Sequence, residues 1–406
     1  MDQPRNSIVL LADGLRPSVL GPYGNTWFDT TRINQLASQS LVFEQCISDS
    51  PDVQLGLRGI LKGIHACDKR ATEYNLLNGL VQSGVGATLV TGRVEKFSDF
   101  QNDFSEIYEV ECPAPTKLAN DISQTYLAGF FAAATDAIKA MNGPGSLILD
   151  CDGLTQAWDA PYLYREQLAD PDDPEPSSRA EVPAIEFVEA VDDPDQLLDF
   201  QIAYGSQIRL FDELLEIALQ EIDQSKWGRE ALFCLTATRG FPLGEHGVVG
   251  FYRPTLYNEC AQVPMLIRWP GALRRSGRSG QLIQPGSVFD FLADWHALKV
   301  PYRSPFPKID PDVLMANKRE MAVVGRSEVE DVIQYSLQTA SWKYLSGTSR
   351  QLFVKPDDIW EFNDVSDLCS QVANDLELQL TSAIEHLTEG RIQDFELSDA
   401  LAFGVE

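Results

Sequence analysis

A single carboxylate follows the first apolar run of the chain. Residues 8–12 are continuously apolar, and Asp13 comes directly after them. Far downstream, a second apolar run ends before Thr238 and Arg239. A carboxylate in such a place can help bind a divalent cation that polarises an ester, whereas an arginine brings a fixed positive charge of its own. These residues are therefore typical of a metal-dependent hydrolytic frame that carries an altered charge.

The elements that must position these residues alternate along the sequence. Short apolar runs that do not alternate with polar residues predict buried parallel strands at residues 8–12, 87–90, 146–149 and 232–235. Periodic apolar positions predict helices over residues 32–41, 118–141 and 202–222. The predicted fold class is α/β, with a mostly parallel central sheet covered by helices on both faces.

Polar or small residues follow each predicted strand. They are Asp13, the pair Thr91-Gly92, Asp150 with Asp152, and the pair Thr238-Arg239. In open α/β sheets, ligands bind beyond the carboxyl ends of the strands. We therefore expect these four strand ends to meet in one crevice.

The chain divides into two predicted domains. Residues 1–305 form the α/β domain, with a proline-rich acidic excursion on the surface near residues 170–195. Four prolines mark a linker over residues 301–311. Residues 312–406 are predicted to form a small antiparallel sheet with a terminal helix over residues 368–387.

Composition excludes several classes of partner. The chain has 406 residues, of which 44% are hydrophobic, so it can bury a substantial core. Its formal net charge of -28 disfavours nucleic acid and anionic membranes as partners. The seven dispersed cysteines are expected to be reduced thiols. No secretory signal and no apolar run of roughly 20 residues is visible, which favours a cytoplasmic location.

Taken together, the segments resemble the sulfatase branch of the alkaline-phosphatase superfamily over almost the whole chain. The segments that carry this resemblance are residues 13–17, 20–24, 34–37, 243–247, 257–259, 263–271 and 339–345. The resemblance implies the alkaline-phosphatase-like fold. It also implies a cysteine that is oxidised to formylglycine, and a divalent cation, usually calcium, held by two pairs of side chains.

The chain departs from this family pattern at the positions that carry the chemistry. Asp13 matches the first metal-binding carboxylate, but Gly14 replaces the second. Val53 stands where the family has its cysteine, and the segment from Pro51 to Gly63 contains no Cys, Ser or Thr. The late ligand pair is Thr238-Arg239, and Phe251 replaces an expected lysine. A histidine expected after the third strand is also missing. One carboxylate cannot supply the 6–8 oxygen ligands of calcium, so we expect no catalytic residue, no bound metal and no other cofactor.

Six residues make up the predicted vestigial pocket: Asp13, Val53, Arg58, Thr238, Arg239 and His246. Asp13 is expected to cap the helix after it or to pair with a cation. We expect Arg239 to form a forked ion pair with Asp13 that replaces the metal. For His246 we expect packing and a hydrogen bond rather than acid–base catalysis.

Arg58 has two possible environments. It could lie near the old anion pocket, but an exposed position on its helix is favoured. Lys62 and His65 follow at helical spacing and could form a small basic patch with it.

Three functions remain open. The first is a catalytically degenerate protein that binds a ligand or partner, either a small anion or another protein. The second is an active metal-dependent sulfuric or phosphoric ester hydrolase with a rearranged site, in which a register shift would recruit Ser50. The third is a structural partner of an active paralogue. A homo-oligomer is also possible.

Overall fold

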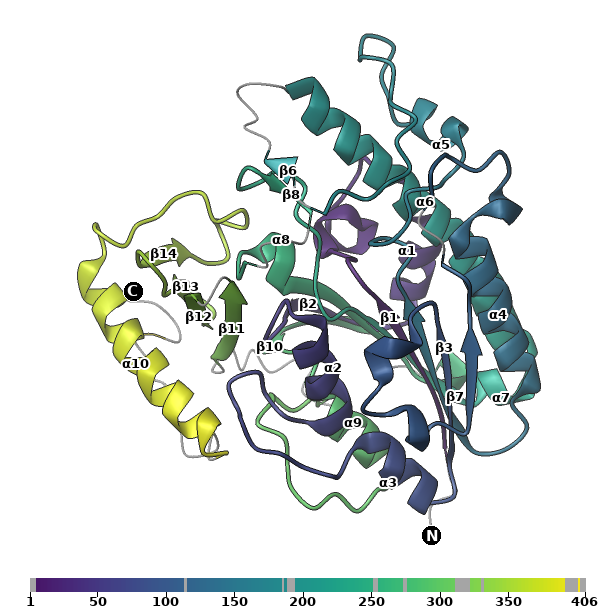
Figure 1. Cartoon of the computed structure of the whole chain (residues 1–406). Coiled ribbons are helices and arrows are strands. Elements are labelled where there is room, and N and C mark those ends of the chain that lie inside the picture. Colours follow the sequence, from purple (N-terminus) through teal and green to yellow (C-terminus); the bar gives the residue numbers. More distant parts are fainter. Residues whose placement is uncertain are drawn as a thin grey trace.

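An eight-stranded sheet forms the centre of the molecule (Figure 1). The computed structural model describes residues 5–112, 115–184, 186–187, 194–250, 255–272, 276–310, 322–329, 332–390 and 401. The sheet order is β10-β2-β9-β7-β1-β5-β3-β4. The strand bounds are β1 (Asn6–Ala12), β2 (Leu41–Ile47), β3 (Gly86–Thr91), β4 (Glu106–Glu109), β5 (Gly145–Cys151), β7 (Ala231–Thr236), β9 (Gln262–Arg268) and β10 (Gly277–Ile283). Only β9 runs antiparallel to its neighbours in this sheet, so the prediction of a mostly parallel sheet is confirmed.

Helices cover both faces of this sheet (Figure 1). The helix bounds are α1 (Thr31–Ser38), α2 (Val53–Lys62), α3 (Leu76–Gln82), α4 (Tyr126–Ala140), α5 (Tyr162–Glu166), α6 (Pro194–Gln224), α7 (Lys226–Arg229), α8 (Asn258–Ala261) and α9 (Ser287–Trp295). On one face, helix α6 contacts α1, α4, α5 and α7. On the other face, the helices α2, α3 and α9 contact one another. None of the described helices is both long enough and apolar enough to cross a membrane.

The register of the central strands aligns their carboxyl ends. Every residue of β1, β5 and β7 is buried, as expected for strands covered on both faces. Leu11 of β1 is level with Asp150 of β5 on one side and with Thr236 of β7 on the other. Beyond β1, the backbone N–H of Asp13 donates to the Cys151 carbonyl over 3.0 Å. These pairings bring the predicted strand ends together.

A second, smaller sheet follows the proline-rich segment. It is antiparallel, in the order β11 (Val323–Val329), β12 (Val332–Gln338), β13 (Trp342–Leu345) and β14 (Gln351–Val354). Helix α10 (Ser370–Thr388) packs its buried leucines against this sheet and forms a separate apolar core. The predicted small sheet with a terminal helix is therefore present, although Pro311 and the rest of 311–321 lie outside the described residues.

The surface excursion is described only in part. Residues 170–179 are exposed or half-buried, in line with the prediction, whereas 185 and 188–193 lie outside the described residues. Between them, β6 (Glu186–Phe187) pairs with β8 (Val248–Val249). All seven cysteines are free, and five of them are buried, so the expectation of unpaired thiols is confirmed.

Two predicted helices are too long. The pattern over residues 32–41 overshoots α1, because the chain already enters β2 at Leu41. The pattern over residues 118–141 begins too early. Thr125 caps α4 by accepting a hydrogen bond from the Ala128 N–H, which fixes the start of the helix there.

Candidate functional site

Asp13 and Arg239 form a forked ion pair at the end of β1. The Nε of Arg239 lies 2.9 Å from Oδ1 of Asp13, and its Nη2 lies 3.1 Å from Oδ2. The hydroxyl of Thr155 also donates to Oδ2 over 3.0 Å. The side chains of Asp13 and Arg239 are only 2% and 14% exposed. The predicted pairing is therefore confirmed, and it is the bidentate geometry that makes arginine–carboxylate pairs strong.

Four further charged residues extend this pair into a network. Arg93 donates to both oxygens of Asp152, over 3.1 and 2.8 Å, and its Nη2 lies 3.5 Å from Oδ2 of Asp13. Lys96 lies in a short 3-10 helix (Val94–Phe97) that follows β3. Its Nζ is 2.7 Å from Asp150 and 2.8 Å from Asp152. The hydroxyl of Thr91 donates to Asp150 as well.

We call Asp13, Arg93, Lys96, Asp150, Asp152 and Arg239 the ion-pair cluster. Three carboxylates face three cations in it, so its formal charge is zero when every group is ionised. The cluster closes the crevice at the carboxyl ends of β1, β3 and β5 and beyond β7, where the sequence predicted a shared site.

Within the cluster, the pKa of Asp13 is lowered and the pKa of Asp150 is raised. Burial alone raises the pKa of Asp13, but the charges of Arg239, Lys96 and Arg93 outweigh burial and hold this pKa well below its ordinary range. Burial also raises the pKa of Asp150, to about 6, despite the opposing charge of Lys96. Asp13 is therefore a buried carboxylate that depends on its cations.

These residues do not fit a divalent cation. Both oxygens of Asp13 are held by Arg239, and Asp150 and Asp152 are held by Lys96 and Arg93. Calcium requires 6–8 oxygen ligands, which these carboxylates do not offer while they are paired. Within the described part of the chain, no group of three or more His, Cys, Asp and Glu side chains could hold a metal ion.

The position of the family's nucleophile lies at the start of α2. Val53 is the first residue of this helix, and Asp52 caps it by accepting a hydrogen bond from the Leu55 N–H. A β-carbon at Gly56 would lie 2.9 Å from that of Thr238, so glycine lets α2 pack closely on the segment after β7. Thr238 therefore packs against α2, and the placement of Val53 and Thr238 in one pocket stays a prediction. The hydrocarbon side chain of Val53 carries no group that could attack an ester.

Ser50, the alternative nucleophile, is buried. It is 1% exposed, and its Oγ accepts a hydrogen bond from the Asp52 N–H over 3.2 Å. The neighbouring Ser48 hydroxyl is hydrogen-bonded to the carbonyls of Ser50 and Thr238. These contacts give both serines structural partners, and they provide no acid–base partner for Ser50.

Two expectations around Arg58 are wrong. Arg58 is half-buried rather than exposed, and its Nη2 donates to the carbonyls of His65 and Asp68 over 2.9 and 2.7 Å. His65 is 1% exposed, and its Nε2 lies 3.0 Å from the Val324 carbonyl. Burial lowers the pKa of His65 to about 4, so no basic patch forms with Lys62.

His246 behaves as expected from its sequence context. Its ring stacks on Tyr257 with centroids 3.7 Å apart, and its Nδ1 lies 2.7 Å from Oε1 of Glu259. Its Nε2 lies 3.3 Å from the carbonyl of Glu361 in the C-terminal part. His246 therefore joins two parts of the chain and does not reach the ion-pair cluster. Phe251, where the resemblance implies a lysine, lies outside the described residues.

Sequence reasoning missed Arg93, Lys96 and Thr155. A signal was present for Arg93, because it follows directly on Thr91-Gly92, a strand end already assigned to the crevice. Lys96 gave a weaker signal, since a lysine in a loop is usually solvated. Its burial depends on the two aspartates at the end of β5, which lie more than 50 positions away.

His246 should titrate at a higher pH than His65 and His296. Burial lowers the pKa of His246, but its hydrogen bond with Glu259 outweighs burial and raises this pKa above the ordinary 6.5. Burial holds the pKa values of His65 and His296 at about 4. The stabilisation from the His246–Glu259 pair is therefore full below pH 6.5 and is lost as pH rises through the raised pKa.

Nitrogen-detected NMR of the imidazole rings measures this difference. The His246 resonance should shift at a pH above 6.5, and the resonances of His65 and His296 should shift only near pH 4. A His246→Gln variant assigns the signal. A titration midpoint of His246 below pH 6.5 would contradict the predicted pairing.

The comparisons with known proteins concern the fold. No protein-family model matches the sequence, and no curated protein matches it. Among solved structures, a putative sulfatase from Bacteroides thetaiotaomicron superposes with a TM-score of 0.75 at 15% identity, over 98% of this chain and 96% of that one. A 2-O GAG sulfatase gives a TM-score of 0.75 at 16% identity, over 100% and 97% of the two chains.

This chain has the sulfatase fold. A phosphonate monoester hydrolase of Agrobacterium radiobacter shares it, with a TM-score of 0.73 at 13% identity over 95% of this chain and 96% of that one. The sulfatase fold therefore extends over both sheets, as the resemblance implied. At 13–16% sequence identity, these similarities concern the fold alone.

Proposed function

We propose that this chain is a catalytically degenerate protein with the sulfatase fold, which acts by binding a ligand or a partner. The observation that carries the proposal is the ion-pair cluster. Arg239 holds Asp13, the one retained carboxylate of the expected metal site, in a forked pair. Two positive charges desolvated at one point repel strongly, so a divalent ion and this guanidinium would compete for the same carboxylate.

The second support comes from the missing nucleophile. Val53 begins α2, and Ser50 is buried with its Oγ bonded to the backbone. Enzymes accelerate such reactions at least about 10⁶-fold, which requires roughly 8 kcal/mol of barrier lowering. The hydrocarbon side chain of Val53 and the carboxylate of Asp13, which is paired with Arg239, cannot lower the barrier by that amount.

The cluster itself has a structural role under this proposal. Arg239 ties the segment after β7 to Asp13 after β1. Arg93 and Lys96, which follow β3, pair with the carboxylates at the end of β5. Because three cations face three carboxylates, the cluster offers little net attraction to a sulfate or phosphate group. We therefore expect the ligand to bind at a part of the surface other than this crevice.

Hydrolytic assays test this proposal. Purified protein should not turn over nitrophenyl sulfate or nitrophenyl phosphate above the buffer rate, with or without Ca²⁺, Mg²⁺, Mn²⁺ or Zn²⁺. A chelator should leave the Tm unchanged, because an ion bound only to the folded state would raise it. An active sulfatase assayed in parallel controls for the substrates. Metal-dependent turnover that disappears in a Ser50→Ala variant would instead support the rearranged hydrolase.

A further inference from the structure

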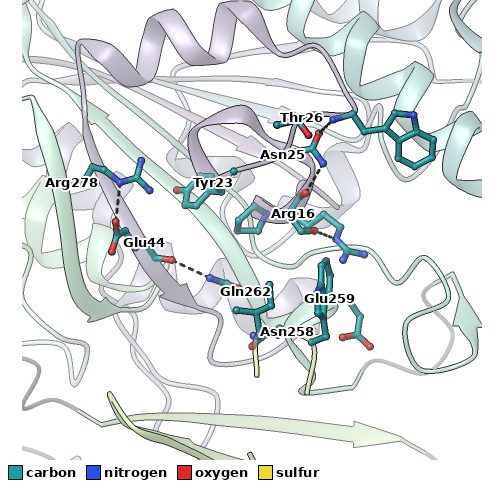
Figure 2. A pocket seen from close by; sticks show the side chains of 15 residues that line it. Arg16, Tyr23, Asn25, Thr26, Glu44, Asn258, Glu259, Gln262 and Arg278 are labelled. Carbon is teal, nitrogen blue, oxygen red and sulfur yellow. Dashed lines mark hydrogen bonds and ion pairs between the residues drawn. The ribbon is translucent and has the colours of Figure 1, made fainter. Parts of the chain in front are cut away.

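A pocket of about 480 Å³ lies beside the crevice and is built from other residues. Figure 2 shows its polar side chains, which come from the segment after β1, from β2 and β10, and from α8 and the start of β9. The lining is Arg16, Pro17, Ser18, Tyr23, Gly24, Asn25, Thr26, Trp27, Glu44, Asn258, Glu259, Gln262, Arg278, Ile359 and Trp360. No member of the ion-pair cluster lines it. We call it the tryptophan pocket.

Two half-exposed tryptophans line this pocket. Trp27 is 43% exposed and Trp360 is 42% exposed, whereas Trp158, Trp227 and Trp269 are at most 8% exposed. They come from segments more than 300 positions apart and line one hollow. Exposed indole faces are unfavourable in water and are typical of binding sites. The ligand should therefore present an apolar face that can stack on an indole.

The charged residues of the pocket are already paired. Arg278 donates from Nε to Glu44 over 2.8 Å and from Nη1 to the Pro22 carbonyl over 2.7 Å. Buried Arg16 pairs with Glu245, and Glu259 pairs with His246. Because each charge has a partner, the pocket has no surplus cation to attract an anionic ligand. An uncharged ligand fits this balance.

The polar side chains are held in fixed orientations. The Nδ2 of Asn258 donates to the Ile359 carbonyl over 2.9 Å, and the Nε2 of Gln262 donates to the Glu44 carbonyl over 3.0 Å (Figure 2 shows the second bond). The remaining side-chain oxygens, Oε1 of Gln262 and Oε2 of Glu44, take no part in these bonds or in the bond from Arg278. These oxygens can accept hydrogen bonds from hydroxyl groups, and their fixed positions reduce the entropy lost on binding.

We propose that the tryptophan pocket binds an uncharged sugar, a mono- or oligosaccharide without sulfate groups. A sugar ring has an apolar C–H face that can stack on Trp27 or Trp360, and hydroxyl groups at its edge that can donate to Gln262 and Glu44. The volume lies within the range of about 300–1,000 Å³ typical of small-molecule sites. The inference rests on the proposed function and deepens it, since it gives the binding protein a class of ligand.

A panel of neutral oligosaccharides tests the proposal. Gluco-, xylo-, galacto-, manno- and chito-oligosaccharides of one to four units are titrated into the full chain, with calorimetry and tryptophan emission as readouts. At least one should bind in the millimolar range or tighter. Trp27→Ala and Trp360→Ala should each weaken binding about tenfold or more, and Trp→Phe variants should recover part of it.

The controls separate binding from folding. Leu163→Ala removes another exposed apolar side chain, 57% exposed on α5 and outside the pocket lining, and should leave binding unchanged. Each tryptophan variant should keep a Tm close to that of wild type, because these side chains are only partly buried. The proposal is wrong if no neutral sugar in the panel binds, if sulfated counterparts bind better, or if both tryptophan variants bind like wild type. These outcomes are independent of the hydrolytic assays, which test the proposed function alone.

Discussion

An Arg239→Met variant should lose about 3 kcal/mol or more of unfolding free energy, because it leaves the carboxylate of Asp13 buried without its main partner. Methionine keeps much of the aliphatic length of arginine, so the substitution removes mainly the charge. Arg93 and Thr155 remain close to Asp13 and keep the loss near the lower end of the range for a broken buried pair. Urea denaturation measures it.

The control for this variant is Arg303→Met. Arg303 is 64% exposed and pairs over 3.1 Å with Asp294, which is 43% exposed, and its contact with the more buried Asp290 is longer, at 3.8 Å. Exposed pairs contribute about 0–1 kcal/mol, so this variant should unfold nearly as wild type does. If Arg239→Met has an equally small effect, the fork does not stabilise the fold, and the electrostatic basis of the proposed function fails.

The loss in Arg239→Met should also depend on pH. The pKa of Asp13 lies below its ordinary value of 3.8 in the folded protein. A group with a lowered pKa contributes stability above its unfolded pKa and loses it as pH falls through the folded pKa. The difference between wild type and variant should therefore be full at neutral pH and shrink below pH 3.8.

Glu361→Gln should cause a loss of similar size in the C-terminal part. Oε1 of Glu361 lies 2.8 Å from Nζ of Lys343 and 2.7 Å from Nζ of Lys355, and Oε2 accepts from the Asn258 N–H over 3.0 Å. The Lys343, Lys355 and Glu361 side chains are at most 4% exposed. Glutamine leaves both lysines without a countercharge, which should cost about 3–5 kcal/mol.

This substitution isolates the charge from the backbone. Glu361 has a φ of 59°, in the left-handed region, and glutamine has a similar steric cost there. Glu328→Gln is the matched control, since Glu328 is 47% exposed in its pair with Arg326. Urea denaturation and limited proteolysis after residue 322 give the readouts. Equal stability of the two variants would show that the buried lysines find other partners or lose their protons.

The sequence predicts the frame of this molecule well because its signals are local. Continuous apolar runs identify β1, β3, β5 and β7, and polar residues at their ends identify the crevice. Arg239 could be paired with Asp13 in advance because the family resemblance implies that both positions belong to one metal site. The structure adds that the two residues follow strands that are neighbours in the sheet.

The remaining contacts depend on long-range partners that no local pattern encodes. Lys96 is buried because Asp150 and Asp152 meet it across the crevice. Arg58 turns from the surface toward loop carbonyls after α2. His65 is buried because the carbonyl of Val324, 259 positions away, packs against it. In each case, tertiary packing overrides the solvated position that a charged or polar residue usually takes.

The buried Glu361 also makes ligand binding in the tryptophan pocket depend on the C-terminal part of the chain. Trp360 precedes it directly, so the salt bridges with Lys343 and Lys355 fix one wall of a hollow whose other walls belong to the large sheet. A ligand that binds between these walls stabilises the contact between the large-sheet part and the C-terminal part. By thermodynamic linkage, that contact strengthens ligand binding by the same free energy. Occupancy should then protect the terminal region from proteases, and a cut in the intervening linker should weaken recognition although every contacting side chain is still present.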